Sequence, residues 1–534
     1  MKGSLKKRVI CLIVVCLLAL TGVSCTSGQK PEMPTDAATT VLKETESYPE
    51  TETESKTQAE TEIETETDTE TETEPILDST QDLIFELLLN GTYEICGSQS
   101  KTVEELYIPE QYMGVPVTSI AHKAFEDCKN LITITIPSSV KGIGDQAFSG
   151  CSSLTSITIP GRVVSIGDQA FSGCSSLTSI IIPNSVTDLG DEVFDFCSNL
   201  TSITLGSGVM NLSPTLFSNC TNLNEIIVDE KNPYYTTEDG VLYSQRMKIL
   251  ISCPRGKSSI TIPDSVTSID DYAFYRCSNL TSVTIPDTVQ SIGEYAFSYC
   301  SGLTTIIIPD SVTGVRDRTF AYCRGLTSVT IGSGAVSIRD HAFAGCTSLT
   351  TVIIPDSMKS IYRSAFSDCT SLVSVTIPSS VTSIDTEAFI CCSSLTEIRV
   401  DERNPNYTDR DGVLYDRDMT AMLCCPNAKI SVTIPDGVTS IAARAFVYCD
   451  KLTSVNIPGS VTSIGDASFF VCRSLTSVTI PDSVTNIGDL VFGWCESLTD
   501  IYYTGTEEEW NAITKGANWD IGTPTYTLHY NYTP

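Results

Sequence analysis

Cysteine is the residue type whose spacing first suggests chemistry in this chain. Fourteen of the 22 cysteines recur every 23 residues, apart from two gaps of 57 between Cys220 and Cys277 and between Cys392 and Cys449. Disulfides are the usual expectation for so many cysteines in an exported protein. One cysteine per repeat cannot surround a zinc ion with four ligands, and free cysteine packs as a small hydrophobe with a weak donor. The spacing therefore favours a ladder of buried structural thiols, with no metal site and no cofactor.

Five further cysteines lie off this ladder, and one pair among them could be oxidised. They are Cys96, Cys253, Cys391, Cys424 and Cys425.

Hydroxyl side chains form a second regular array. Ser156 and Thr158 in one repeat, and Ser282 and Thr284 in another, alternate with apolar residues, which predicts a strand with one face in solvent. One interpretation is a solvated face of residues with β-propensity. The other is a binding face that multiplies weak contacts along the array, for example to a polysaccharide.

The two 57-residue gaps each contain the same insertion, near 229–257 and 401–429. Runs such as Val-Leu-Tyr and Ile-Leu-Ile predict a β-hairpin that stands out from the coil. Its tyrosines are candidate binding residues, with the alternative that they seal the interrupted coil. They are Tyr234, Tyr235, Tyr243, Tyr407 and Tyr415. The stretch 409–412 lacks most ligands of a calcium loop, so a turn is favoured there.

Catalysis has little support in the sequence. His122, His341 and His529 are the only histidines and lie far apart. There is no glycine-rich phosphate loop, HExxH or GxSxG motif. A net charge of −32 without a basic stripe argues against nucleic acid. We therefore expect a binding protein without catalytic residues rather than an enzyme.

The 23-residue period is typical of solenoid coils, in which each repeat forms one turn. Pro160 should end a strand, because proline cannot donate to the ladder. Asp168 is expected to act as the N-cap of a short helix or 3₁₀ turn. The apolar residues of this coil are Leu154, Ile157, Ile159, Val163, Ile166 and Phe171. Seventeen strand phrases between Tyr107 and Tyr503 predict one long parallel sheet.

The phrase Ala-Phe-x-x-Cys-x-x-Leu-x-x-Ile-x-Ile-Pro-x-x-Val-x-x-Ile-Gly, repeated over roughly 83–534, resembles the BspA-like leucine-rich repeats of bacterial surface proteins. This resemblance implies a β-rich leucine-rich-repeat solenoid (formally α/β), a curved right-handed superhelix with a parallel sheet on its concave face. It also implies export and, in several members, adhesion to host matrix proteins or to other bacteria.

Both ends of the solenoid need caps, because a solenoid must cover its exposed core. Residues 82–122 read as an N-terminal cap and first coil, with Asn90-Gly91 in a hairpin turn. Residues 501–534 read as a C-terminal cap, which the resemblance also implies. Thr506 and Glu509 form a capping-box pattern, so a short helix should carry Trp510 and Ile513 onto the last coil.

The first residues carry an export signal. A basic start and an apolar run of about twelve residues suit a signal peptide over 1–24 and are too short to span a membrane. Cys25 follows a small residue as in a bacterial lipobox, which implies a lipid anchor, although Gly22 departs from that pattern. The alternative is ordinary cleavage beside an incidental Cys25. The acidic Thr/Glu-rich segment 25–81 is expected to be a disordered stalk.

The prediction is a lipid-anchored, exported protein of the bacterial cell surface, with a solenoid over 123–500. It should mediate adhesion or protein–protein interaction with a host extracellular-matrix or microbial surface protein or glycan. Contact with the membrane should be by the anchor only, and nucleic acid is not expected as a partner. The alternatives are a structural envelope spacer without a specific ligand and an extracellular polysaccharide-binding module.

Overall fold

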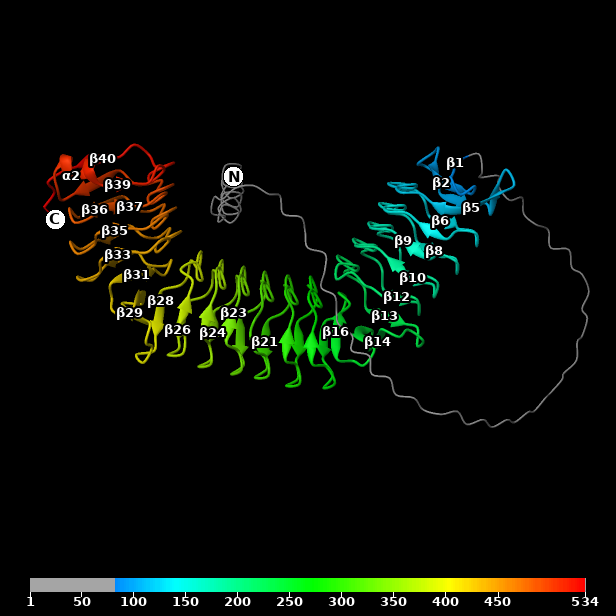
Figure 1. The fold of residues 1–534 in the computed structure, drawn as a ribbon, viewed down its shortest axis with the longest axis horizontal. Coiled ribbons are helices and arrows are strands. Elements are labelled where there is room, and N and C mark those ends of the chain that lie inside the picture. The colour runs from blue at the N-terminus through cyan, green and yellow to red at the C-terminus, as the bar shows by residue number, and fades with distance from the viewer. Residues whose placement is uncertain (1–81, 534) are drawn as a thin grey trace, which may run out of the picture. The chain divides into compact units, whose positions relative to one another are not determined.

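The computed structural model describes residues 82–533, and the compact unit to which they belong begins at Pro75. The predicted signal peptide, Cys25 and the acidic segment lie outside the described residues. Figure 1 shows the described chain as a stack of short coils with strands side by side. Adjacent strands pair in parallel at a separation of 23 residues, as Ser179 pairs with Ser202. The predicted parallel-strand solenoid with 23-residue coils is confirmed.

One strand from each coil forms what we call the first ladder. Its seventeen predicted members from Tyr107 to Tyr503 are all present, and β40 of the C-terminal cap adds one more. They are β3 (Glu105–Tyr107), β6 (Thr133–Thr135), β8 (Ser156–Ile157), β10 (Ser179–Ile182), β12 (Ser202–Leu205), β13 (Glu225–Val228), β17 (Ser259–Thr261), β19 (Ser282–Thr284), β21 (Thr305–Ile308), β22 (Ser328–Ile331), β24 (Thr351–Ile353), β26 (Ser374–Ile377), β28 (Glu397–Val400), β32 (Ser431–Thr433), β34 (Ser454–Asn456), β36 (Ser477–Ile480), β38 (Asp500–Tyr503) and β40 (Thr527–His529).

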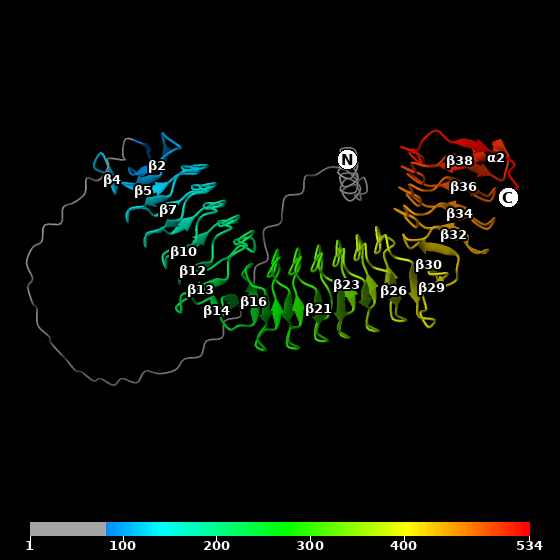
Figure 2. The ribbon, with the colours of Figure 1, turned by 180° about the vertical axis from the view of Figure 1, so that it is seen from behind.

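A second ladder of shorter strands runs beside the first, visible in the reverse view of Figure 2. The sequence had indicated only one strand per coil. Its members are β5 (Val115–Ile120), β7 (Gly142–Ile143), β9 (Ser165–Ile166), β11 (Asp188–Leu189), β16 (Ile249–Ser252), β18 (Ser268–Ile269), β20 (Ser291–Ile292), β23 (Ser337–Ile338), β25 (Ser360–Ile361), β27 (Ser383–Ile384), β31 (Ala421–Cys424), β33 (Ser440–Ile441), β35 (Ser463–Ile464), β37 (Asn486–Ile487) and β39 (Thr514–Lys515). All but β5, β16 and β31 have two residues, which is too few to show alternation in the sequence.

We call the eight residues that follow the second strand and end with the ladder cysteine the turn edge, as in 144–151 and 293–300. The predicted helical turn is wrong, because alternate N–H groups bond to the next coil and those between them, such as Ala147 and Ser149, close only isolated turns. Gln146, Phe148 and Gly150 donate to the carbonyl oxygens of the adjacent coil at 2.7–2.8 Å. Left-handed backbone at the third and seventh positions, as at Gln146 (φ 55°) and Gly150 (φ 75°), accompanies this pattern.

Asp168 does not cap a helix, and this prediction is also wrong. The Oδ1 of Asp145 accepts the backbone N–H of Asp168 at 3.0 Å, and that of Asp168 accepts from Asp191 at 2.8 Å. The same contact joins Glu294 to Asp271 at 2.7 Å. The repeated aspartate therefore accepts a backbone hydrogen bond from the next coil. This contact explains why the aspartate recurs every 23 residues.

Phenylalanine and cysteine fill the core behind the turn edge. Phe148 stacks on Phe171 with ring centroids 5.3 Å apart, and Phe297 stacks on Phe320 at 5.2 Å. Cys174 donates its S–H to the carbonyl oxygen of Phe148 at 3.3 Å. Burial raises the pKa of Cys151 to about 12 and that of Cys174 well above its usual value, so both thiols stay protonated and can donate. The structural-thiol interpretation is confirmed for the ladder.

Each insertion forms an antiparallel meander that ends in the second ladder. In the first copy, β14 (Tyr235–Glu238) pairs with β15 (Val241–Ser244), β15 pairs with β16, and β16 pairs in parallel with β18. The second copy repeats this with β29 (Tyr407–Arg410), β30 (Val413–Asp416) and β31.

The middle strand of each meander divides the hydrophobic core. Side chains alternate across a strand, so Leu242 packs into the core of residues 83–226 while Val241 and Tyr243 pack into the next one. Leu414 and Tyr415 are split between cores in the same way. The solenoid therefore has three consecutive cores, which we call the N-terminal, middle and C-terminal segments.

A β-hairpin lies at the N-terminal end of the described solenoid and a short helix lies near its C-terminal end. β1 (Leu83–Leu87) pairs antiparallel with β2 (Tyr93–Ser98), whose far edge joins β5, and β4 (Gln111–Tyr112) also pairs with β5. At the other end, α2 (Glu507–Ala512) has a complete capping box between Thr506 and Glu509 and buries Trp510. Ile513 is buried with it.

No helix between residues 82 and 533 has the length and apolar character needed to cross a membrane.

Candidate functional site

The predicted hydroxyl array lies in solvent on the first ladder. Ser156, Thr158, Ser282 and Thr284 are exposed. Their face is less polar than the sequence had indicated, because Ile181, Ile307 and Ile353 occupy equivalent positions and are about two-thirds exposed. The ladder thus presents hydroxyl groups interrupted by apolar residues at the same spacing.

Two of the candidate tyrosines are not available for binding. Tyr243 is 2% exposed and Tyr415 is 1% exposed. Both lie on the middle strand of a meander, and their rings close the core where one segment meets the next. The prediction that the insertions stand out from the coil is wrong for this strand, and the sealing interpretation holds for these residues.

The remaining tyrosines of the insertions are tied to neighbouring coils. The hydroxyl of Tyr235 donates to the carbonyl oxygen of Met210 at 2.8 Å. The hydroxyl of Tyr407 accepts from the N–H of Ile384 at 3.1 Å. Tyr234 is 47% exposed, but the second copy has Asn406 at this position. Only Tyr234 of the five could present an open ring to a partner.

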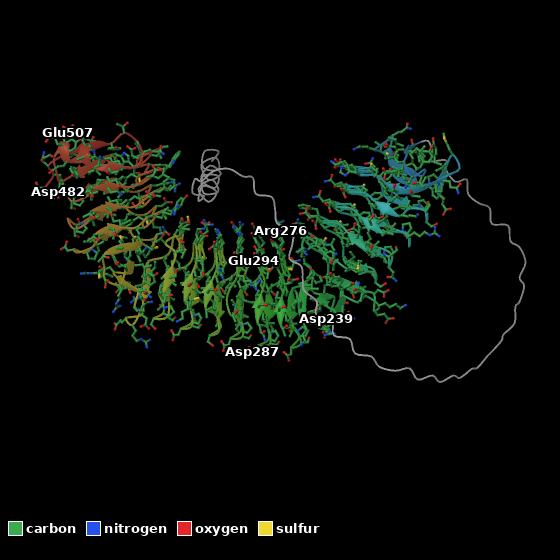
Figure 3. All side chains as sticks on the ribbon, viewed as in Figure 1. Asp239, Arg276, Asp287, Glu294, Asp482 and Glu507 are labelled. Atoms are coloured by element: carbon green, nitrogen blue, oxygen red, sulfur yellow. The ribbon has the colours of Figure 1, made fainter. Side chains whose placement is uncertain are left out.

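A different surface gathers aromatic and basic residues. We call it the Tyr/Arg cluster: Tyr272, Tyr295 and Arg318 at the third turn-edge position, and Arg276, Tyr299 and Tyr322 at the seventh. These six belong to three consecutive coils at the start of the middle segment. Figure 3 shows Arg276 and Glu294 at one edge of these coils, with Asp287 at the opposite edge.

The third-position row is a stack. Tyr272 and Tyr295 lie 4.8 Å apart and nearly parallel. The Arg318 guanidinium lies 5.4 Å from the centroid of Tyr295 and donates to its hydroxyl at 2.8 Å. A cation over an aromatic face is attracted by the ring quadrupole, so Arg318 is held in one orientation.

The seventh-position row is a second stack. Tyr299 and Tyr322 lie 4.8 Å apart, and Arg276 lies 5.5 Å from the centroid of Tyr299. Arg276 also donates to Oδ1 of Asn219 at 2.7 Å, which continues the row across the first insertion. Tyr275 joins the rows through edge contacts with Tyr272 at 5.5 Å and Tyr299 at 5.8 Å.

The cluster offers hydrogen-bond donors at neutral pH. Burial raises the pKa of Tyr272 and of Tyr299, so both phenols remain protonated. Tyr299 and Tyr322 are each 38% exposed. Tyrosine and arginine are the residue types that carry most binding energy at protein interfaces.

The sequence analysis missed this surface because it looked for features that every repeat shares. The informative signal was a position whose residue type differs between repeats. The seventh position is Gly150 and Gly173 in the N-terminal segment but Tyr299 and Tyr322 in the middle segment. Aligning the coils by their cysteines and comparing that column would have found it.

The other candidate chemistries stay separate in the structure. No group of three or more potential ligands within 82–533 could hold a metal ion. Asp409 accepts the N–H of Val400 at 2.7 Å, and Gly412 has a φ of 74°, as in the predicted turn. His529 pairs with Asp500 at 2.8 Å in the C-terminal cap, whereas His341 lies on the turn edge of the middle segment.

The ladder cysteines and the off-ladder Cys96, Cys253, Cys424 and Cys425 are free thiols. The thiol of the ladder residue Cys277 donates to the carbonyl oxygen of the off-ladder Cys253 at 3.6 Å. In the same way, the thiol of Cys449 donates to the carbonyl oxygen of Cys425 at 3.9 Å. The off-ladder thiols thus extend the ladder at each insertion, and the suggested oxidation of two of them is not seen.

Comparison with family models matches the BspA type leucine-rich-repeat region, in six copies, over residues 105–237, 252–334, 315–410 and 422–517. No curated protein matches the chain.

Solved structures of bacterial leucine-rich-repeat proteins are similar to parts of it. One from Eubacterium ventriosum is 25% identical with a TM-score of 0.46, covering 60% of this chain and 95% of its own. One from Bacteroides ovatus is 25% identical with a TM-score of 0.42, covering 84% and 98%. A leucine-rich cell-surface protein from Faecalibacterium prausnitzii is 27% identical with a TM-score of 0.41, covering 60% and 93%.

Proposed function

The chain belongs to the BspA-type leucine-rich-repeat family, and on that premise we propose that it is an exported cell-surface protein whose solenoid binds a partner, in adhesion or protein–protein interaction. The observation that carries the proposal is the Tyr/Arg cluster. Two rows of stacked tyrosines and arginines lie on a rigid backbone that bonds each turn edge to the next. A surface of this composition is typical of protein interfaces.

Retention of the purified chain on immobilised matrix proteins and on microbial cells tests the binding function. We expect selective, saturable retention of at least one of these partners. If a multivalent form of the chain is retained by none of them, the binding function fails and the structural spacer becomes the better account.

Anchoring to the membrane is the second part of the proposal, supported by the lipobox-like pattern that ends at Cys25. A Cys25→Ala variant should leave the membrane fraction and appear in the medium, because a lipid chain supplies the membrane affinity. Unchanged fractionation of the variant would exclude the lipid anchor.

Polysaccharide binding is a second candidate, favoured by the exposed hydroxyl groups of Ser156, Thr158, Ser282 and Thr284 on the first ladder. Replacing Thr158 and Thr284 by alanine should then weaken retention on extracellular polysaccharide. Replacing Gln146 by alanine serves as the control, because that side chain lies on the turn edge and not on the first ladder.

A further inference from the structure

The arginines at or beside the turn edge of coils 270–363 differ in their partners from several arginines further along the chain. Arg399, Arg403 and Arg444 each form an ion pair with a carboxylate at 2.8 Å. Within residues 82–533, no such pair is formed by the arginines at or beside the turn edge of coils 270–363. They are Arg276, Arg316, Arg318, Arg324, Arg339 and Arg363. Other described arginines, such as Arg162 and Arg410, also form no ion pair, so what distinguishes these six is their grouping along consecutive coils.

Two acidic residues beside the cluster, Asp271 and Asp317, accept backbone N–H groups of the next coil. Asp271 Oδ1 accepts the N–H of Glu294 at 2.7 Å, and Asp317 Oδ1 accepts the N–H of Asp340 at 3.1 Å. These contacts hold the two carboxylates between coils, so they do not fold back onto Arg276 or Arg318. The guanidinium groups retain donors for an external carboxylate.

The tyrosine rings favour a hydrogen-bonding ligand over a stacking one. Tyr272 lies against Tyr295, and Tyr299 against Tyr322, so their facing surfaces are already covered. A sugar ring would need those faces. The phenol hydroxyls and the guanidinium edges remain, and both donate hydrogen bonds. Arginine binds carboxylates through two parallel hydrogen bonds.

The seventh-position side chains are present despite an unfavourable backbone. Arg276, Tyr299 and Tyr322 have φ of 60–64°, a region that favours glycine. Gly150, Gly173 and Gly345 occupy the same position in other coils with φ of 72–75°. The fold therefore accepts glycine here, and large side chains at this position indicate a role at the surface.

We infer that the Tyr/Arg cluster binds an acidic segment of a partner protein, with its carboxylates on the guanidinium groups of Arg276 and Arg318. This inference rests on the proposed binding function and adds its site and its ligand chemistry. Three coils at a spacing of about 4.8 Å span roughly 10 Å, the length of about three extended residues. The binding motif is therefore short and contains several Asp or Glu residues.

The test measures binding of the full chain to a fluorescein-labelled peptide of alternating glutamate and glycine. The same peptide with glutamine for glutamate and the uronic-acid polymer polygalacturonate are the comparison probes. The variant Arg276→Gly/Tyr299→Gly/Tyr322→Gly should bind the glutamate peptide at least roughly tenfold more weakly. Its glycines match the residues of other coils, so it should fold. Gln146→Ala/Gln169→Ala changes the N-terminal turn edge and should bind normally.

Arg276→Lys/Arg318→Lys keeps the charge but removes the planar fork, so its affinity should also fall. Equal binding of the triple variant and the parent chain would overturn the inference. So would equal binding of the glutamine peptide, no binding of the glutamate peptide, or binding of polygalacturonate alone. If the triple variant still adheres to matrix proteins or cells, adhesion stands and only the site fails. If the parent chain does not adhere, the proposed function itself fails.

Discussion

The turn edges of the N-terminal and middle segments have the same backbone and different surfaces. In the N-terminal segment, Gln146 donates to Gln169 at 2.6 Å and Gln169 donates to Glu192 at 2.8 Å, beside glycines at the seventh position. In the first three coils of the middle segment, the same two positions carry stacked tyrosines and arginines. A repeat backbone thus determines where side chains stand, and two variable positions per coil determine what the surface can bind.

This separation has a physical cause. The core positions of each coil contact the equivalent positions of its neighbours, so a change in one repeat disturbs the next. The third and seventh turn-edge positions point away from that core. Their backbone is held by bonds between coils, such as Tyr299 N–H to the carbonyl oxygen of Ala321 at 2.8 Å. The side chains can therefore vary without altering the stack.

The largest expected effect is on the shared core. Phe171→Ala and Phe320→Ala should each lower the free energy of unfolding by about 3–5 kcal/mol, because each removes a fully buried ring from a stack. Urea unfolding followed by circular dichroism measures both. A large loss in one variant and none in the other would show that the two segments do not share one scaffold.

Removing one ladder thiol should lower the free energy of unfolding equally in the two segments, and by less than removing a phenylalanine ring. Cys174→Ala and Cys323→Ala leave the carbonyl oxygens of Phe148 and Phe297 without the S–H donor. We expect each to lower the free energy of unfolding by about 1–3 kcal/mol. Differential scanning calorimetry on the two variants checks this, and a cost confined to one segment would contradict equivalent ladders.

Replacing a seventh-position glycine by alanine should cost a different amount of stability in the two segments. Gly173→Ala and Gly345→Ala both place a side chain at positive φ, which costs about 1–2 kcal/mol. A Cβ on Gly345 would lie 2.6 Å from the Tyr322 ring, whereas one on Gly173 would meet only Gly150 at 3.4 Å. Gly345→Ala should therefore lose more stability and also displace the ring. Equal losses by urea unfolding would count against this close packing.

The smallest effect is expected for Tyr299→Gly. It loses a ring stack worth about 0.5–1.5 kcal/mol and removes a left-handed tyrosine that costs about 1–2 kcal/mol. The two terms nearly cancel, so the unfolding midpoint should hardly move while binding at the cluster falls. A stability loss as large as that of Phe320→Ala would assign Tyr299 to the core and not to the surface.

Much of the fold was predictable because it repeats. The cysteine register located every coil, both insertions and the seventeen strands of the first ladder. The capping box identified α2, because its two hydrogen bonds depend only on residues three apart. The second ladder was not predicted, because strands such as Ser165–Ile166 are too short to show a period in the sequence.

The insertions show where local pattern was insufficient. Val241, Leu242 and Tyr243 read as a strand, and they form one. Their sequence could not show that the strand lies between two cores, with Leu242 facing one and Tyr243 the other. The sequence therefore left surface binding and sealing of the coil as alternatives for these tyrosines, and two of them are buried.

The sequence by itself determined the period, the buried thiols, the caps and the absence of recognisable catalytic motifs, because these depend on residue type and spacing along the chain. Only the tertiary structure decided which variable residues meet. Tyr299 and Tyr322 are separated by a full repeat, yet their rings stack at 4.8 Å because inter-coil hydrogen bonds hold consecutive turn edges together. The same stacking of coils turns scattered tyrosines and arginines into one surface.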